Sequence, residues 1–117
     1  MVIHHVALEV APEGSDAEVA FWRLLGFAEV IPPGELAERA RWVELEGTQV
    51  HLLLAGAPAI PAEAHVALAT RDYDAVIAGL RAAGHEAAPR REHFGAPRTQ
   101  VRSPAGHLVE VMAPPRV

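Results

Sequence analysis

Four residues of this sequence have side chains suited to chemistry, and they stand in two matching pairs. His5 and His65 each open the same four-residue sequence, His-Val-Ala-Leu. His51 and Glu110 each stand four residues after a glycine, in stretches rich in valine and leucine. Imidazole and carboxylate groups can bind divalent metal ions or transfer protons, although a single histidine in a strand is more often structural. The paired placement makes these four residues the first candidates for a functional site.

The four positions belong to a duplication that runs through the whole chain. Three landmarks recur at separations of 58 to 60 residues: the sequence at His5 and His65, and the glycine pairs Gly26/Gly84 and Gly47/Gly106. Three landmarks that keep one register are hard to obtain by chance, even in a chain rich in alanine, valine and leucine. The sequence therefore predicts a single domain, residues 1–117, built from two modules, residues 1–56 and 57–117.

Each module is expected to contain a strand, a helix and three further strands. In the first module, residues 2–10 are rich in β-forming residues, and residues 15–18 have the capping-box pattern, in which serine and glutamate satisfy each other's free backbone N–H groups. An apolar face followed by Gly26 predicts a helix that ends in a left-handed cap. The remaining strands are expected between turn sequences, at residues 27–31, 41–46 and 49–55.

The second module repeats this plan. Four apolar or aromatic residues stand at the i, i+3, i+4, i+7 spacing of a helix that should end at Gly84: Tyr73, Val76, Ile77 and Leu80. The predicted strands of this module are residues 65–70, 86–90, 98–102 and 107–112. Residues 93–97 contain glycine and proline and show no periodicity, so they are expected to form a loop.

Side chains alternate across a strand, so His5 shares its face with Ala7 and Glu9. The opposite face carries valine and leucine and should pack under the helix. The face with His5 carries small and polar residues, which suit the wall of a cavity, and the strand that begins at His65 has the same alternation. We therefore expect His5 and His65 to point into an open concavity.

Motifs spread over nearly the whole chain resemble those of one superfamily. They are the two HVAL strands, the LGF sequence at 25–27, the QVHL strand at 49–52 and the PAGHLVE sequence at 104–110. In this order and spacing they are similar to the vicinal oxygen chelate superfamily, which includes glyoxalase I and bleomycin-resistance proteins. The resemblance implies an α+β fold of two tandem βαβββ modules that form a curved mixed sheet around a metal-binding cavity.

The resemblance also implies a ligand set, because the first and last strands of each module supply the metal ligands in that superfamily. Carried over to this chain, the ligands of one divalent ion are His5, His51, His65 and Glu110. Three imidazoles and one carboxylate would accept Ni²⁺, Co²⁺, Zn²⁺, Mn²⁺ or Fe²⁺ without selecting among them. A six-coordinate ion would keep two positions for water or for two substrate oxygens, and Glu110 could detach to act as a general base.

Three more residues are candidates for the substrate pocket: Glu9 on the wall that carries His5, His93 in the predicted loop, and Arg98, which could meet an anionic substrate. For His93 and Arg98 the plainer interpretation is a solvated side chain.

The other histidines and the aromatic residues receive structural interpretations. His4 is expected to be a partly exposed neighbour on the wrong face, and His85 and His107 to be surface or turn residues. Trp22 is assigned to helix packing, and Trp42 to the core or to a dimer interface.

The implied activity is that of a glyoxalase-like lyase or isomerase acting on a small oxygen-chelating substrate. Glyoxalase I enzymes typically have an arginine for the glutathione carboxylate at the position of Glu9, so the reversed charge argues against a glutathione-linked substrate. A ring-opening dioxygenase, a further alternative, needs three open positions on the ion, and His51 would occupy one of them. The competing class is a non-catalytic protein that sequesters a drug or metabolite, as bleomycin-resistance members do. An accessory module of a larger complex is the third possibility.

Composition restricts the partners and the location. The net charge of −5 over 117 residues disfavours binding to a phosphate backbone, so nucleic acid is not an expected partner. The absence of cysteine excludes disulfides and thiolate ligands. The chain starts without a leader-like segment, and no apolar run approaches the roughly 20 residues that span a bilayer, so we expect a cytoplasmic protein. The resemblance implies a homodimer, whose sites lie within one chain or are shared between two.

Overall fold

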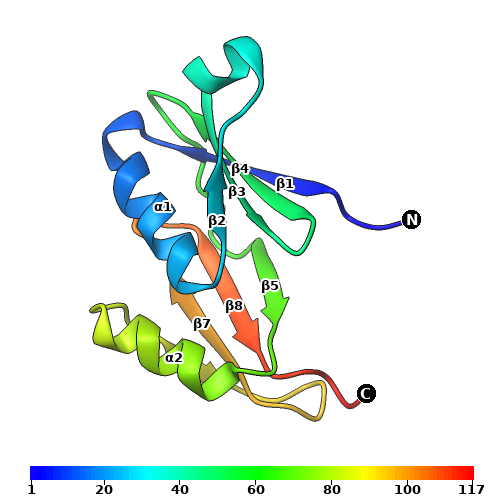
Figure 1. Ribbon diagram of the computed structural model, residues 1–117. Helices are drawn as coiled ribbons and strands as arrows, with labels where there is room; N and C mark the ends of the chain where they lie inside the picture. The colour runs from blue at the N-terminus through cyan, green and yellow to red at the C-terminus, as the bar shows by residue number, and fades with distance from the viewer. The chain divides into compact units, whose positions relative to one another are not determined.

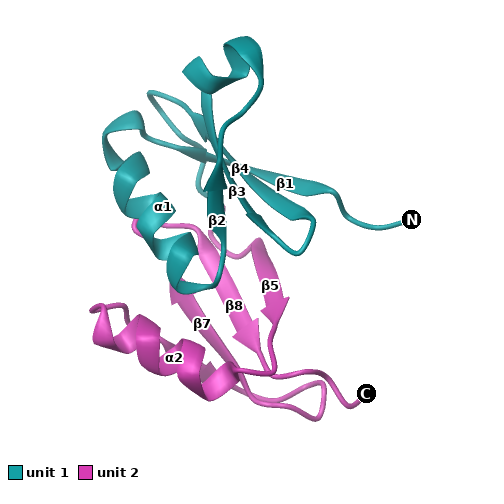
Figure 2. Cartoon of the chain, in the orientation of Figure 1, with its two compact units in different colours: residues 1–60 teal, residues 61–117 magenta.

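Figure 1 shows the computed structural model of the protein, which describes all residues, 1–117. The chain divides into two compact units, a first unit of residues 1–60 and a second unit of residues 61–117 (Figure 2). Each unit contains one mixed four-stranded sheet and one α-helix, in the order βαβββ. This confirms the predicted α+β fold of two modules. Neither helix is both long enough and apolar enough to cross a membrane.

In the first unit the sheet order is β1-β4-β3-β2. Strand β1 runs parallel to β4, and the other neighbours are antiparallel. The elements are β1 (His5–Val10), α1 (Ser15–Leu24), β2 (Ala28–Val30), β3 (Ala40–Leu45) and β4 (Thr48–Leu54), with short 3-10 helices at Pro12–Gly14 and Gly34–Glu38.

The second unit repeats this topology in the order β5-β8-β7-β6, with β5 parallel to β8. Its elements are β5 (His65–Ala69), α2 (Tyr73–Ala82), β6 (Ala88–Arg90), β7 (Arg98–Arg102) and β8 (Leu108–Met112). All eight predicted strands are present, and their ends differ from the predicted ends by at most three residues. Residues 93–97 lie in the predicted loop between β6 and β7.

The strand register confirms the duplication residue by residue. In the first unit Ala7 of β1 lies opposite His51 of β4, and in the second unit Ala67 of β5 lies opposite Glu110 of β8. The alanine of each His-Val-Ala-Leu sequence is therefore the neighbour of a candidate site residue. This equivalence could not be read from the sequence repeat alone, because the repeat does not specify which strands pair.

Both helices end as predicted. Gly26 has a φ of 97° and Gly84 has a φ of 90°, a region that glycine enters without steric cost. After each glycine, the next backbone N–H donates to a carbonyl five residues earlier, at 3.1 and 3.0 Å. This is the Schellman arrangement, which turns the chain from each helix into the next strand.

The predicted capping box at the start of α1 is wrong. The helix is capped by Gly14 without a side-chain hydrogen bond, because the 3-10 helix before it runs directly into α1 and gives Ser15 a helical conformation. A serine inside the helix cannot cap it. Instead, Ser15 Oγ accepts a hydrogen bond from Arg41, and Glu18 accepts one from the indole N–H of Trp22 at 3.1 Å.

Each sheet buries one face against its own helix. In the first unit the fully buried side chains include Phe21 and Trp22 of α1, which confirms the packing role expected for Trp22. They lie with residues of the central strands, Val43, Val50 and Leu52. The second unit buries Leu80 of α2 with Val101, Val109 and Val111. The other face of each sheet carries the candidate site residues.

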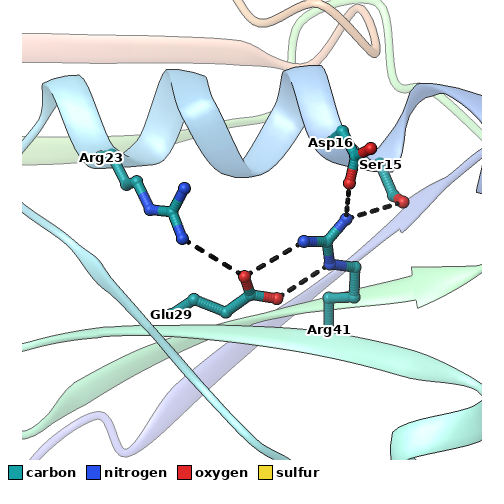
Figure 3. Close-up of polar contacts among 5 residues, drawn as sticks. All are labelled: Ser15, Asp16, Arg23, Glu29 and Arg41. Carbon is teal, nitrogen blue, oxygen red and sulfur yellow. Dashed lines mark hydrogen bonds and ion pairs between the residues drawn. The ribbon is translucent and has the colours of Figure 1, made fainter.

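An arginine in β3 ties three elements of the first unit together (Figure 3). Arg41 binds both carboxylate oxygens of Glu29 on β2, at 2.8 and 3.1 Å, and it also donates to Ser15 and Asp16 of α1. The hydrogen bond from Arg41 lowers the pKa of the Glu29 carboxyl group, and Glu29 in turn raises the pKa of Arg41. Arg23 adds a longer contact to Glu29 at 3.4 Å.

Candidate functional site

The first unit brings two of the four candidate ligands together. His5 lies on β1 and His51 on β4, and both are on the face of the sheet opposite the core. Their rings stack with centroids 4.0 Å apart and planes inclined by 14°. His51 is only 8% exposed, whereas His5 is exposed on the edge strand. The parallel pairing of β1 with β4 thus produces the contact that the repeat alone only suggested.

A tryptophan covers the other side of the His51 ring. Trp42 of β3 pairs directly with His51, and the two rings stack with centroids 3.9 Å apart and planes inclined by 5°. The imidazole is therefore held between Trp42 and His5. Trp42 is half-buried and belongs to this face rather than to the hydrophobic core. Of its two sequence interpretations the core is therefore wrong, and the dimer interface stays a prediction.

Hydrogen bonds fix the edge of the same imidazole. His51 Nε2 lies 2.7 Å from Gln49 Oε1, and Gln49 Nε2 donates to Glu44 at 3.0 Å. Burial lowers the pKa of His51, and the nearby imidazoles of His5 and His4 lower it further. The ring therefore favours its neutral form, which is the form that binds metal ions.

His4 does reach the candidate site. Its Nδ1 atom lies 2.9 Å from Nδ1 of His5, and the two rings meet edge to face. The alternation of side chains along an extended strand places His4 opposite His5. Strand β1 begins only at His5, so His4 lies outside it and the alternation rule does not apply there.

The second unit brings the other two candidate ligands together. His65 lies on β5 and Glu110 on β8, and His65 Nε2 is 3.8 Å from Glu110 Oε1. The other ring nitrogen of His65, Nδ1, lies 2.8 Å from the backbone carbonyl of Glu63. The first and last strands of each unit thus place a pair of ligand-type residues on the same face.

The carboxylate of Glu110 already has strong partners within its unit. Arg98 donates to Oε1 at 2.6 Å and Gln100 donates to the same oxygen at 3.2 Å. Both side chains of the ion pair are buried, with 12% of Arg98 and 4% of Glu110 exposed. Arg98 is also fixed by a hydrogen bond to the carbonyl of Arg91. All contacts of Glu110 use Oε1, which leaves Oε2 free of protein partners.

The remaining predicted residues lie apart from these pairs. Glu9 accepts a hydrogen bond from the backbone N–H of Ala59 at 3.1 Å and so fastens the segment that follows β4. His93 is exposed in the loop between β6 and β7, with its ring 6.3 Å from that of Phe94. Their assignment to a substrate pocket stays a prediction. Of the two interpretations given for His107, the surface is excluded because the residue is only 4% exposed. It directly follows the turn into β8, where Ser103 Oγ accepts the His107 N–H.

An open pocket lies on the same face of the second unit, beside Gln100. Its volume is about 270 Å³. Seven residues of β6, β7, β8 and the segment before β6 line it: Glu86, Ala88, Arg90, Gln100, Val101, Arg102 and Leu108. Gln100 connects the pocket to Glu110, because its amide N–H group donates to that carboxylate.

The donor types present fit a divalent ion, because imidazole and carboxylate suit first-row transition metals. Neither unit alone assembles three or more side chains that could hold such an ion. The convergence of His5, His51, His65 and Glu110 therefore stays a prediction. Metal–nitrogen bonds of about 2 Å lie close to the imidazole plane, so two nearly parallel stacked rings cannot both bind one ion as they stand. The exposed His5 would have to turn out of the stack.

Comparisons with known proteins place this fold in a recognised group. No protein-family model matches the sequence, and no curated protein sequence matches it. Solved structures do match. A glyoxalase family protein of Bacillus anthracis is 22% identical with a TM-score of 0.86, over 97% of this chain and 94% of that one. A glyoxalase/dioxygenase of Nostoc punctiforme is 18% identical with a TM-score of 0.78, over 98% and 92%.

A third solved structure, lactoylglutathione lyase of Agrobacterium tumefaciens, is 22% identical with a TM-score of 0.73, over 96% of this chain and 92% of that one. At these identities the likeness concerns the fold. The chain has the two-module fold of glyoxalase and dioxygenase proteins. This is the two-module fold that the resemblance to the vicinal oxygen chelate superfamily implied.

Proposed function

We propose that this protein is a metal-dependent, glyoxalase-like lyase or isomerase that acts on a small oxygen-chelating substrate not linked to glutathione. The observation that carries the proposal is the repeated placement of paired ligand-type side chains. His5 with His51, and His65 with Glu110, occupy equivalent positions on the helix-free faces of the two sheets. The proposed ligand set is these four residues, within one chain or shared between the two chains of a cytoplasmic homodimer.

The donor set supports a single ion of Ni²⁺, Co²⁺, Zn²⁺, Mn²⁺ or Fe²⁺. When bound, the ion would supply Lewis-acid polarisation of a substrate carbonyl. His51 supports this role because its ring is neutral, buried and fixed by Trp42 and Gln49.

Glu110 is the proposed general base. Its Oε1 is held by Arg98 and Gln100, which fix the direction of the carboxylate, and Oε2 has no protein partner. In an isomerase, Glu110 would detach from the ion, and Oε2 would take a proton from the hydroxyl-bearing carbon next to the substrate carbonyl and return it to the carbonyl carbon, while the hydroxyl proton passes to the carbonyl oxygen. A base fixed on one oxygen and open on the other suits this short transfer.

The negative charge of Glu9 supports a substrate without a glutathione tail. Glu9 places a carboxylate on the wall that carries His5, and this carboxylate would repel an anionic tail. Its hydrogen bond to Ala59 holds that carboxylate near the strand. The open pocket beside Gln100 measures about 270 Å³, just below the range of roughly 300 to 1,000 Å³ for small-molecule sites.

Metal analysis of protein purified without a histidine tag tests the proposal. We expect close to one transition-metal ion per chain, and a large loss of it in His51→Ala and in Glu110→Ala. His85→Ala, which removes a half-buried imidazole near the end of α2, is the matched control and should keep the metal. Unchanged metal content in both site variants would contradict the proposal.

A second candidate function is supported by the ion pair of Glu110. Arg98 neutralises this carboxylate at 2.6 Å, so the second unit is electrostatically complete without an added cation. A protein that sequesters a drug or metabolite without metal would have this property. Purified protein that contains no metal, and that binds none on titration with Zn²⁺, Ni²⁺ or Co²⁺, would favour this candidate over the enzyme.

A further inference from the structure

Three hydrogen-bonding side chains form a line on the helix-free face of the first unit, and the line ends at His51. Glu44 of β3 pairs directly with Gln49 of β4, and its Oε1 atom accepts from Gln49 Nε2 at 3.0 Å. Gln49 Oε1 lies 2.7 Å from His51 Nε2. Gln49 and His51 are two residues apart on one strand, so their side chains share a face. The line is therefore a product of the strand register.

The chemistry of these groups allows one pattern of hydrogen atoms. An ionised carboxylate only accepts hydrogen bonds, so the amide NH₂ of Gln49 must face Glu44. The amide oxygen then faces His51, and because this oxygen also only accepts, His51 Nε2 must carry the hydrogen. A neutral imidazole has a single N–H group. The lone pair of the ring is therefore on Nδ1.

Stacking on both sides keeps the imidazole ring of His51 in this orientation. Trp42 covers one side of the imidazole at 3.9 Å and His5 covers the other at 4.0 Å. Turning the ring over about its Cβ–Cγ bond would put Cε1 in the place of Nε2 and remove the hydrogen bond to Gln49, and the ring would have to leave both stacks during the turn. In the metal-free chain the plane of the ring is thus fixed by stacking, and the edge that it presents is fixed by Gln49. When His5 turns away to bind an ion, Trp42 and Gln49 still hold the ring.

We propose that Glu44 and Gln49 are positioning residues that hold His51 as the Nε2–H tautomer, so that Nδ1 is the nitrogen His51 offers to a ligand. The tautomer itself can be tested on the metal-free chain. The role of Nδ1 as a metal ligand rests on the proposed function. Neither residue needs to contact the ligand itself. Hydrogen-bond partners of metal-binding histidines typically change metal affinity by about 10- to 100-fold, and we expect a loss in this range for Gln49→Met.

The tautomer can be measured on the full, metal-free chain by nitrogen-15 NMR with labelled histidine. In the wild type, His51 should show a protonated Nε2 and an unprotonated Nδ1, with no averaging between them. Gln49→Met removes the acceptor and should give a mixture of the two neutral tautomers. Gln49→Lys puts a donor at the same place and should reverse the pattern to Nδ1–H.

Two further variants separate positioning from a general structural effect. Gln49→Glu keeps an acceptor beside Nε2 and should preserve the wild-type tautomer. Gln100→Met removes an amide side chain from the corresponding face of the second unit and should leave the signals of His51 unchanged. A wild-type His51 protonated on Nδ1, or a Gln49→Lys variant that keeps Nε2–H, would overturn the inference. The wild-type spectrum tests it even where a variant fails to fold.

Titration of the same labelled protein with Zn²⁺ distinguishes this inference from the proposed function. We expect the Nδ1 signal of His51 to shift while the Nε2–H signal is kept. A shift confined to Nε2 would overturn the assignment of Nδ1 as the ligand nitrogen. A spectrum that shows the Nε2–H tautomer but does not respond to Zn²⁺ would support the tautomer and contradict the proposed function.

Discussion

The two units have the same backbone plan but hold their candidate site residues by different forces. In the first unit, His51 is held by aromatic stacking between Trp42 and His5. In the second unit, the equivalent Glu110 is held by charge and hydrogen bonds from Arg98 and Gln100. The strand register fixes where a side chain emerges, and the neighbouring strand decides how it is held. A duplicated fold can therefore keep one geometry while the two copies carry different chemistry.

The hydrophobic cores of the two units differ as well. Truncation of a large, fully buried helix residue in each core should change the free energy of unfolding more than any other substitution proposed below. Trp22 of α1 and Leu80 of α2 are equivalent, and both are fully buried. Trp22→Ala should lower the free energy of unfolding by about 3–5 kcal/mol and Leu80→Ala by about 2–5 kcal/mol. Trp22 should lie at the upper end because Glu18 also loses a hydrogen bond.

Urea denaturation followed by circular dichroism measures both changes, and the exposed Leu36→Ala is the control. A Trp22→Ala variant less destabilised than Leu80→Ala would contradict this ranking of the two cores.

The link between helix and sheet should show the next largest difference. Arg41 makes charged hydrogen bonds to Glu29 and Asp16, whereas its equivalent in the second unit, Thr99, makes a neutral hydrogen bond to the hydroxyl of Tyr73. Arg41→Met should cost about 1–3 kcal/mol and Thr99→Val about 1 kcal/mol. Salt should reduce the cost of Arg41→Met, because the charged network is partly exposed. Equal costs that do not depend on salt would argue against this contrast.

Removal of the Arg98 guanidinium, which competes with a metal ion for Glu110, should raise the metal affinity of the second unit. Arg98→Met leaves Glu110 with Gln100 but without a positive charge, so a divalent cation should bind more tightly. We expect a gain of about tenfold in Zn²⁺ affinity, measured by isothermal titration calorimetry. Arg102→Met, in which the lost guanidinium contacts only backbone carbonyls, is the matched control. Weaker Zn²⁺ binding in Arg98→Met would contradict this prediction and show that the orientation of the Glu110 carboxylate by Arg98 outweighs its competition with the ion.

The smallest expected difference between the two units is in the pH dependence of the free energy of unfolding, and it comes from His51. The folded pKa of His51 is lowered from its ordinary value of 6.5, so below about pH 6.5 the unfolded chain takes up a proton that the folded chain resists. This contribution makes the free energy of unfolding fall as the pH falls, until His51 is protonated in both states. His51→Phe keeps an aromatic ring but cannot titrate, so it should lose less stability between pH 7 and 5. An unchanged pH profile would contradict this assignment.

Patterns within single elements predicted most of the fold. β-Rich stretches between turn sequences, repeated in both modules, located all eight strands, and Gly26 and Gly84 located the helix ends. The predicted capping box failed for a local reason too: the 3-10 helix before Ser15 continues into α1, and the serine motif does not reveal what precedes it.

The surroundings of the site were harder to predict because they depend on strand pairing. Trp42 meets His51 because Glu46 and Gly47 form a two-residue hairpin loop, with φ values of 52° and 84°. That turn would have placed Trp42 opposite His51 if its length had been assigned correctly from the sequence. The partner of Arg98 depends on the register of β7 with β8, and the five-residue connection 103–107 does not fix that register as a two-residue loop does.

The alanines opposite the site residues have a consequence for engineering. Ala7 and Ala67 are exposed on edge strands and face His51 and Glu110 with nothing larger than a methyl group. Volume can therefore be added there without altering any donor atom or disturbing the core. Larger side chains at these two alanines would block the approach of a small molecule to this face of each sheet. The donor atoms of His51 and Glu110 would stay unchanged.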